Sequence, residues 1–391
     1  MTVRTTETER KYEAGSGTRL PAFEQLAQVA SVRDAPAEQM EAEYYDTGDL
    51  RLIRAGITLR RRLGGHDEGW HLKLPAGADS RREIRVPLGR GRAVPEALAQ
   101  LIRVHSRGRE LRPIATITTG RQRLLLVDAS GAELAEVASD EVTARATVEA
   151  GAARVTQWSE VEIELTGGGR DLLTAADRLL LAAGLSRSAA RAKLERAIGL
   201  PGEAAVPAGG ALSASAPAGQ VATAYLRTQY AALIALDPMV RAQEPDSVHQ
   251  MRVAVRRSRS TLQTFGSLYP SAEAEPLASE LRWLGQVLGQ ARDAEVLAAH
   301  LASRADALPA AGLIGPVAAR IAGHYAQVRA AGQSGVAETL DSARYFALLD
   351  RMETFVLAPP LTKLGARRAG AVLPAAVRES YAKTRRRIRQ A

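Results

Sequence analysis

Alternating charged residues open the chain, in the run Glu7-Thr8-Glu9-Arg10-Lys11. In a β-strand every second side chain points to the same face, so a strand here aims Glu7, Glu9 and Lys11 at one surface. Carboxylates suit hard divalent cations such as Mg²⁺, and a lysine amine suits phosphate oxygens. The run therefore indicates metal-dependent phosphate chemistry, although a solvated edge strand would show the same pattern.

A second acidic strand is predicted over residues 160–165. Glu160, Glu162 and Glu164 share one face of it, and apolar residues occupy the positions between them and at its end. Like charges that lie beside one another on a sheet repel. Three carboxylates on one face are therefore costly unless cations neutralise them, and a solvent-facing strand is the simpler alternative.

Further runs with strand-like alternation carry basic or mixed charges. The residues that they place on shared faces are Arg60 and Arg62; His71 and Lys73; Arg81, Glu83 and Arg85; Arg121 and Arg123; and Glu136 and Asp140. The first 165 residues thus hold about seven strand-like runs, several of them separated by turn residues such as Gly64-Gly65. A closed barrel lined by both signs of charge would fit, with basic groups for an anionic chain and acidic groups for a metal.

Residues 1–200 resemble a CYTH domain, of the triphosphate tunnel metalloenzyme superfamily. The matching features are Glu-x-Glu-x-Lys at 7–11, Tyr44-Tyr45-Asp46-Thr47, Leu59-Arg60-Arg61-Arg62, Leu72-Lys73, the run at 160–165, and Ala192-Lys193-Leu194-Glu195-Arg196-Ala197. The resemblance implies an eight-stranded antiparallel barrel, open as a tunnel, that cleaves or cyclises a triphosphate compound with Mg²⁺ or Mn²⁺. The family's usual Ser-Lys-Tyr element reads Ala192-Lys193-Leu194 here, so the lysine is present but its neighbours differ.

This resemblance and the charges together give the residues expected roles. The expected catalytic residues are Glu7, Glu9 and Lys11; the expected metal ligands are Glu7, Glu9, Asp140, Glu160, Glu162 and Glu164; and the expected phosphate-binding residues are Lys11, Arg60, Arg62, Lys73, Arg121, Arg123 and Lys193. A metal-polarised water would attack the terminal phosphorus, a reaction that asks mostly for positioning and charge neutralisation. The sequence has no Walker-type Gly-rich loop, which argues against a P-loop enzyme.

Composition narrows the class of protein further. A length of 391 residues suggests two or three domains, and the absence of cysteine excludes disulfides, a thiolate nucleophile and Cys-ligated zinc. We expect a cytoplasmic protein without a membrane partner, because the sequence shows neither a signal peptide nor a long apolar segment. The net charge of +9 favours acidic partners, but an aromatic content of 4% makes a single-stranded nucleic-acid platform a poor fit.

The composition changes after residue 200. Residues 167–200 have apolar side chains at helical spacing, whereas 201–220 are mostly Ala, Gly, Pro and Ser, which is typical of a flexible linker. From there to the end the pattern is helical. The predicted domains are therefore 1–200 and 221–391, joined by a linker at 201–220.

A basic helix is predicted in the second domain. Its cationic face carries His249, Arg252, Arg256 and Arg259, with Arg257 beside them, and a separate apolar stripe holds Val248, Met251, Val255 and Leu262. Like charges at helical spacing destabilise an isolated helix, and a polyanion ligand would offset that repulsion. A solvated basic face is the alternative. Further along, Arg292 and Asp293 are candidates to pair with a neighbouring helix.

Residues 217–391 resemble a CHAD domain, the conserved-histidine α-helical family. The match rests on His249-Gln250-Met251-Arg252-Val253 with Arg256-Arg257, and on Leu288-Gly289-Gln290-Ala291-Arg292-Asp293. The resemblance implies a helical bundle in two similar halves, with the basic residues at 249–259 binding inorganic polyphosphate. A second copy of the His-and-basic helix is not found, so we expect the bundle to be shortened at its C-terminal end.

The sequence as a whole is interpreted as an α+β chain of two domains, a β tunnel followed by an all-α bundle. The predicted activity is metal-dependent hydrolysis of inorganic tripolyphosphate, with a helical domain that binds polyphosphate and directs the enzyme to polyphosphate granules. An adenylate cyclase, a thiamine triphosphatase, a non-catalytic polyphosphate scaffold and, on charge alone, a nucleic-acid binder are the alternatives. A homodimer is one of the states that the sequence allows.

Overall fold

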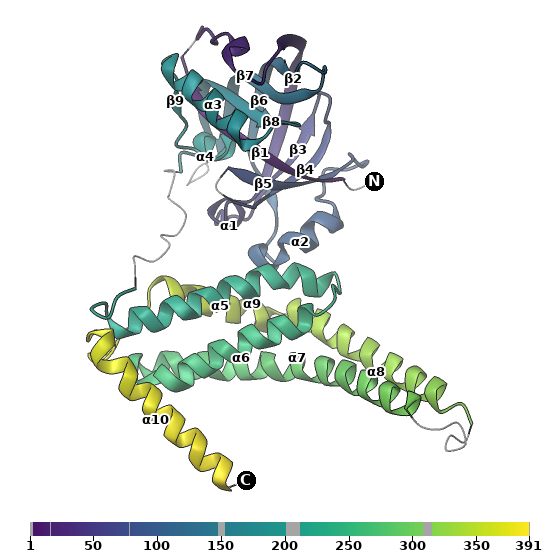
Figure 1. Ribbon diagram of the computed structural model, residues 1–391, viewed down its shortest axis with the longest axis vertical. Coiled ribbons are helices and arrows are strands. Elements are labelled where there is room, and N and C mark those ends of the chain that lie inside the picture. Colours follow the sequence, from purple (N-terminus) through teal and green to yellow (C-terminus); the bar gives the residue numbers. More distant parts are fainter. Residues whose placement is uncertain are drawn as a thin grey trace. The chain divides into compact units, whose positions relative to one another are not determined.

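The computed structural model describes residues 3–15, 17–77, 79–147, 153–200, 212–307 and 315–390. The chain divides into two compact units, residues 1–205 and 206–391 (Figure 1). Within the described residues the first unit combines β-strands with short helices, and the second is entirely helical. No helix of the described chain is both long and apolar enough to span a membrane.

Eight antiparallel strands of the first unit form a closed ring. They are β1 (Val3–Ala14), β2 (Ser31–Asp46), β3 (Thr58–Leu63), β4 (Gly69–Pro75), β5 (Ser80–Val86), β6 (Arg112–Val127), β7 (Glu133–Thr147) and β8 (Ala153–Leu165). Their order is β5-β4-β3-β2-β6-β7-β8-β1, and the first half of β1 returns to pair with β5. The predicted eight-stranded antiparallel barrel is therefore confirmed.

Strand β2 was not predicted from the sequence. Most residues in the first half of β2 are exposed, and apolar and polar residues do not alternate there. This half also contains Pro36. A bulge between Ala35 and Glu38 shifts its register against β6. Its second half is more deeply buried, and pairing with the equally long β6 holds the strand in the ring.

Alternation along the strands separates the core from the charged interior. On β8, Val161 and Ile163 are fully buried in an apolar cluster that includes Leu172 and Leu173 of α3 (Arg170–Ala182). The glutamates between them point to the other face, inside the ring. The predicted division of this strand into an apolar and an acidic face is thus what the structure shows.

Short helices complete the first unit: α1 (Arg51–Arg54), α2 (Glu96–Ser106), α3 and α4 (Lys193–Ile198). The expectation of continuous helix over 167–200 is wrong in its middle. Gly184, with φ of +90°, follows the end of α3, and the chain then returns as the two-residue strand β9 (Ser186–Arg187) to pair with β1. Lys193 therefore begins a separate helix.

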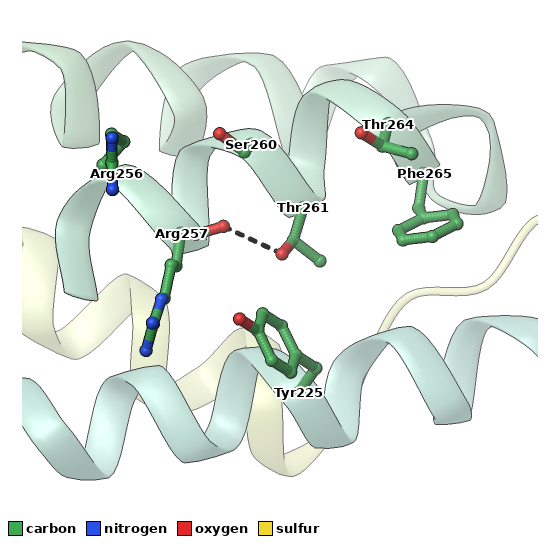
Figure 2. Close-up of a pocket in the computed structure, with 7 residues that line it drawn as sticks. All are labelled: Tyr225, Arg256, Arg257, Ser260, Thr261, Thr264 and Phe265. Atoms are coloured by element: carbon green, nitrogen blue, oxygen red, sulfur yellow. Dashed lines mark hydrogen bonds between the residues drawn. The ribbon is translucent and has the colours of Figure 1, made fainter. Parts of the chain in front are cut away.

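The described part of the second unit contains six α-helices: α5 (Ala218–Arg241), α6 (Ser247–Phe265), α7 (Ser271–Asp306), α8 (Val317–Leu340), α9 (Ala343–Leu357) and α10 (Ala369–Gln390). Met251, Val255 and Leu262 of α6 are buried, as the predicted apolar stripe requires. A groove of about 350 Å³ lies between α5 and α6 (Figure 2). Helix α5 begins within the predicted linker range, of which residues 201–211 lie outside the described chain.

A buried carboxylate fixes the connection between β2 and α1. Asp46 has no exposed surface, and its carboxylate accepts hydrogen bonds from the backbone N–H groups of Thr47, Leu52 and Ile53 at 2.6, 2.9 and 2.9 Å. The Asp46 of the Tyr-Tyr-Asp-Thr run therefore has a structural role, because it satisfies donors that water cannot reach.

We expect Asp46→Ala to lower the free energy of unfolding by about 3 kcal/mol, since it leaves buried N–H groups without acceptors. Asp46→Asn retains one carbonyl oxygen and should lose less. Urea unfolding followed by tryptophan fluorescence reports on the first unit through Trp70 and Trp158. Equal stability of Asp46→Ala and wild type would contradict this role.

Candidate active site in the β tunnel

The inward-facing side chains surround a cavity of about 180 Å³ inside the ring. Seven carboxylates line it: Glu7, Glu9, Glu38, Asp67, Glu136, Glu162 and Glu164. Nine cationic side chains line it as well: Lys11, Arg60, Arg62, Lys73, Arg81, Arg85, Arg121, Arg191 and Lys193. Ala192 is the one apolar side chain among the described lining residues. The cavity is thus built to hold a charged guest.

The strand register places like charges directly opposite one another. Glu164 of β8 lies between Glu9 of β1 and Glu136 of β7, so three carboxylates form one row across three strands. In the next row, Lys11 lies opposite Glu162. A row of three carboxylates is destabilising unless each one finds a cation.

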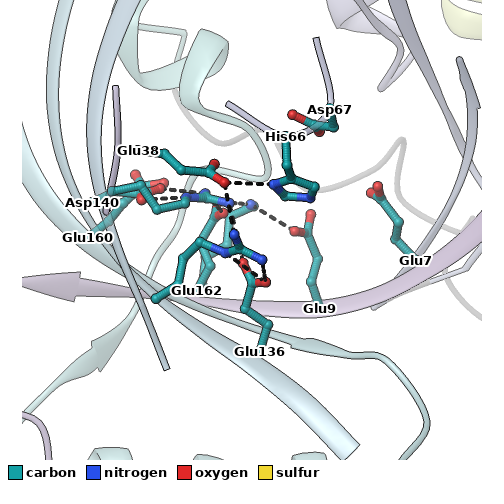
Figure 3. Close-up of polar contacts among 12 residues, drawn as sticks. Glu7, Glu9, Glu38, His66, Asp67, Glu136, Asp140, Glu160 and Glu162 are labelled. Carbon is teal, nitrogen blue, oxygen red and sulfur yellow. Dashed lines mark hydrogen bonds and ion pairs between the residues drawn. The ribbon is translucent and has the colours of Figure 1, made fainter. Parts of the chain in front are cut away.

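Lys193 lies at the centre of the most compact acidic cluster, whose three carboxylate residues are labelled in Figure 3. Its Nζ is 2.8 Å from Asp140, 2.6 Å from Glu160 and 2.7 Å from Glu162. Carboxylate oxygens of these three residues lie within 4.8 Å of one another, close enough to bind one metal ion. Asp140 and Glu160 lie behind the cavity lining rather than in it. The ammonium of Lys193 therefore takes the place that a metal ion would occupy.

The pKa values of this cluster reflect that pairing. Burial alone would raise the pKa of Glu162, but Lys11, Lys193 and Arg121 outweigh burial and hold it well below its usual range. Burial likewise opposes ionisation of Asp140, and Lys193 and Arg121 again lower its pKa. Arg121 bonds both carboxylates, at 2.6 Å from Asp140 and 2.7 Å from Glu162. This side of the tunnel is already neutralised.

Helix α4 holds Lys193 in place. Lys193 is its first residue, and Glu195 of the same helix accepts a hydrogen bond from the backbone N–H of Arg191 at 2.7 Å. Arg81 of β5 donates to the Arg191 carbonyl at 2.7 Å. These two contacts, neither predicted from the sequence, tie the loop before Lys193 to the ring.

The row of three carboxylates is neutralised unevenly. Glu9 pairs with Lys11 at 3.1 Å, and Glu136 pairs with Arg123 at 2.8 Å. Glu164, between them, makes no ion pair or hydrogen bond to any described residue. Burial, followed by the charge of Glu7, raises its pKa to about 7. Burial also raises the pKa of Glu7, even though Lys73 lies 2.5 Å away.

This part of the lining fits a divalent cation. Glu7, Glu9 and Glu164 offer hard oxygen ligands, and the raised pKa values of Glu7 and Glu164 show that protein cations do not fully balance their charge. Glu9 differs, because Lys11 and Lys73 outweigh its burial and lower its pKa. Among the described residues, Asp140, Glu160 and Glu162 bring three ligand atoms within 4.8 Å of one another, and Glu7, Glu9 and Glu164 do not, so one ion could bind these three only after their side chains move closer together.

The expected phosphate-binding residues come together, with one exception. Lys11, Arg60, Arg62, Lys73, Arg121 and Lys193 line the cavity, whereas Arg123 lies outside the lining and bonds Glu38 at 2.8 Å. Tyr44 lines it too, and Arg60 donates to its hydroxyl at 3.3 Å. Burial opposes ionisation of Tyr44, but Arg60 outweighs it and lowers the pKa of the phenol.

Several lining residues escaped the sequence reasoning, among them Glu38, His66 and Asp67. Glu38 belongs to the unpredicted strand β2, and His66 and Asp67 lie in the turn between β3 and β4. Turn residues carry no alternation, so only their closeness to Arg60-Arg61-Arg62 in the chain hinted at a place near the site. Asp67 pairs with Arg62 at 2.8 Å, and that pairing helps to lower its pKa despite burial.

The predicted basic residues of α6 have different neighbours. Arg256 and Arg257 line the α5–α6 groove together with Tyr225 (Figure 2). Arg252 pairs with Asp293 of α7 at 3.1 Å, and Arg292 lies 3.9 Å from Asp246, so the predicted pairing with a neighbouring helix is confirmed. His249, Arg256, Arg257 and Arg259 form no ion pair with any described residue, which leaves the three guanidinium charges available.

Comparison with known proteins agrees with both units. A family model for CYTH domains matches residues 5–198, and one for CHAD domains matches residues 224–391. A Mycobacterium tuberculosis protein named as uncharacterized is 39% identical over 362 residues, which cover 90% of this chain and 70% of that protein.

Solved structures give weaker matches. PptA from Streptomyces chartreusis is 26% identical with a TM-score of 0.34, and the match covers 38% of this chain and 53% of that one. A protein from Pyrococcus horikoshii is 19% identical with a TM-score of 0.29, over 49% of this chain and 97% of that one. TM-scores of this size carry no functional information.

The ring and its charged interior define a tunnel of the kind that acts on triphosphate compounds, joined in one chain to a helical unit with a basic face. The chain belongs to the CYTH family through residues 5–198 and to the CHAD family through residues 224–391. Membership supports a triphosphate-related, metal-dependent activity and a link to polyphosphate.

The raised pKa of Glu164 predicts how stability depends on pH. Its folded-state pKa of about 7 lies above the ordinary value of 4.5, so ionisation costs stability as pH rises from about 4.5 to 7. At pH 8 without metal, Glu164→Gln should therefore be more stable than wild type, by on the order of 3 kcal/mol at most.

Urea unfolding at pH 5 and pH 8, with and without Mg²⁺, measures this effect. At pH 5 the difference should shrink, and Mg²⁺ at pH 8 should stabilise wild type more than the variant. Glu141→Gln, an exposed change on β7, is the control. An unchanged difference at both pH values would contradict the assignment.

Proposed function

We propose that the tunnel hydrolyses inorganic tripolyphosphate with the help of Mg²⁺ or Mn²⁺. The observation that carries the proposal is the cavity lining, which combines cationic and acidic side chains and in which Ala192 is the one apolar residue among the described lining residues. Small-molecule sites for organic ligands are lined mainly by apolar and aromatic side chains. A nucleobase or the rings of thiamine would find no such wall here, which favours an all-phosphate substrate over ATP or thiamine triphosphate.

Two groups of carboxylates have different roles in this proposal. Glu7, Glu9 and Glu164 would hold the metal ion once their side chains move closer together, and Glu162 would contribute from the adjacent position. Asp140 and Glu160 hold Lys193, so they act as metal ligands only if its ammonium moves away. When bound, the metal ion neutralises phosphate charge and activates the attacking water.

The cations of the tunnel bind the phosphate chain. Lys11, Arg60, Arg62, Lys73, Arg121 and Lys193 present N–H donors to it from several sides of the ring. In the substrate-free protein several of them pair with carboxylates, so binding exchanges one anionic partner for another. Because the donors are held in advance, little reorganisation is needed, and charge stabilisation by fixed groups is the main demand of phosphoryl transfer.

The helical domain binds inorganic polyphosphate in the same proposal. Arg256, Arg257 and Arg259 carry charges without a carboxylate partner among the described residues, His249 offers its ring nitrogens beside them, and Arg252 shares its charge with Asp293. Arginine suits bidentate contacts to phosphate. The helical domain would place the enzyme on polyphosphate granules. The domain boundaries in this proposal are 1–200 and 221–391, with a linker at 201–220.

We expect Mg²⁺- or Mn²⁺-dependent phosphate release from tripolyphosphate, little from ATP or thiamine triphosphate, and none in EDTA. Glu9→Gln should reduce kcat by at least about a hundredfold, because it removes a metal ligand and the partner of Lys11. Glu141→Gln should retain wild-type activity. Faster turnover of ATP, or its conversion to cyclic AMP, would contradict the proposal.

Polyphosphate binding tests the second unit independently. Arg256→Ala combined with Arg257→Ala should weaken binding of long-chain polyphosphate by about tenfold or more, and wild-type binding should weaken with salt. Arg344→Ala is the matched control, because Arg344 is engaged by Glu280 at 2.7 Å and stacks on Trp283. Fluorescence anisotropy with labelled polyphosphate measures both. Equal losses in the control and the double variant would contradict a specific role for α6.

A further inference from the structure

A histidine at the solvent-exposed edge of the cavity has no role in the account so far. His66 lies in the turn between β3 and β4, and its side chain is 57% exposed although it also lines the cavity. The turn begins with Gly64 and Gly65, at φ of +75° and +77°. A Cβ at Gly65 would lie 3.1 Å from an oxygen of Glu38, so the glycines let the turn fold closely over β2.

His66 is held by one ring nitrogen and is free at the other. Its Nδ1 lies 2.8 Å from Oε1 of Glu38, as Figure 3 shows. The same Oε1 accepts a hydrogen bond from Arg123 of β6 at 2.8 Å, and Arg123 in turn bonds Glu136 of β7. Nε2 of His66 has no partner among the described residues.

This arrangement fixes the position of the ring proton. Oε1 of Glu38 already accepts a hydrogen bond from Arg123, and a carboxylate can only accept, so we assign Nδ1 of His66 as the donor. In the neutral ring Nε2 is then an acceptor, and only in the imidazolium does it become a donor. Phosphate oxygens that carry no proton are acceptors. Nε2 can therefore bind phosphate only when the ring is protonated.

Other charged groups near the turn are already engaged. Asp67 on the same turn pairs with Arg62, and Glu68 accepts a hydrogen bond from the backbone N–H of Gly64 at 3.1 Å. Glu38 is thus the charged group in direct contact with the ring of His66. Histidine is the residue type that changes charge between about pH 5 and 8.

We propose that His66, fixed by Glu38, binds an outer phosphate group of the tunnel's substrate through Nε2 and only as the imidazolium. The proposal rests on the proposed function, since it assigns a specificity residue to the same cavity. Because histidine side chains generally lose their proton between about pH 5 and 8, substrate affinity should be lower at pH 8.5 than at pH 6. His66 is a binding residue here, and Glu38 is a positioning residue that determines which ring nitrogen of His66 carries the proton.

The test compares KM for tripolyphosphate at pH 6 and pH 8.5, at saturating Mg²⁺, in the full chain. His66→Ala should raise KM by about tenfold at pH 6, the loss of a hydrogen bond to a charged group, and leave it unchanged at pH 8.5. Every value is compared with wild type at the same pH, because phosphate groups themselves titrate near pH 6. The melting temperature of each variant checks its folding.

Two further variants test the proton assignment. His66→Gln carries an amide that donates at any pH, so its KM at pH 8.5 should fall below that of wild type. Glu38→Gln can donate to Nδ1, which permits the neutral ring to carry its proton on Nε2. The part of the pH dependence of KM that comes from His66 should therefore be smaller in Glu38→Gln than in wild type. Loss of a purely structural contact would not produce this effect.

The outcomes separate this inference from the proposed function. If wild type does not turn over tripolyphosphate, the proposed function fails, and calorimetric binding of tripolyphosphate to the same variants still decides the role of His66. If wild type is active but His66→Ala leaves KM unchanged at pH 6, the binding role is overturned. An equal rise at both pH values overturns the requirement for the imidazolium.

Discussion

The first unit depends on one constraint: charges that its strands turn inward must be neutralised by one another. The ring buries carboxylates such as Asp140 and Glu162 almost completely, and a buried charge without a partner is costly. Opposite charges therefore interlock across strands, with Arg121 bridging β6 to β7 and β8, and Lys193 joining α4 to both. Removing one partner of such a pair lowers the stability of the fold by more than the intact pair contributes, because the other charge stays buried without a partner.

That constraint also shows where the neutralisation is incomplete. The Lys193 side of the tunnel is balanced, which is why the pKa values of Asp140 and Glu162 fall. The Glu164 side is not balanced, because strand register sets Glu164 between Glu9 and Glu136 without a cation of its own. The most compact group of carboxylates and the group whose charge is least neutralised therefore lie at different places in the tunnel. A metal ion is more valuable at the second, where it relieves repulsion that the protein leaves in place.

Much of this site could be predicted from the sequence, because alternation along a strand assigns faces without knowledge of its neighbours. The cavity is lined by five residues assigned to inward faces in this way: Glu7, Glu9, Lys11, Glu162 and Glu164. Which residues face one another across strands could not be predicted, since pairings such as β1 with β5 and β8 join segments far apart in the chain. The same reason hid the partnership of Lys193 with Asp140, and the turn that brings His66 over Glu38 has no periodic pattern to reveal it.

One measurement tests the central claim most directly: anomalous diffraction from crystals of the full chain soaked in Mn²⁺. The account predicts a manganese peak within ligand distance of Glu164 and Glu9, with Lys193 still paired to Asp140 and Glu160. A peak among Asp140, Glu160 and Glu162, with the Lys193 ammonium displaced, would contradict it.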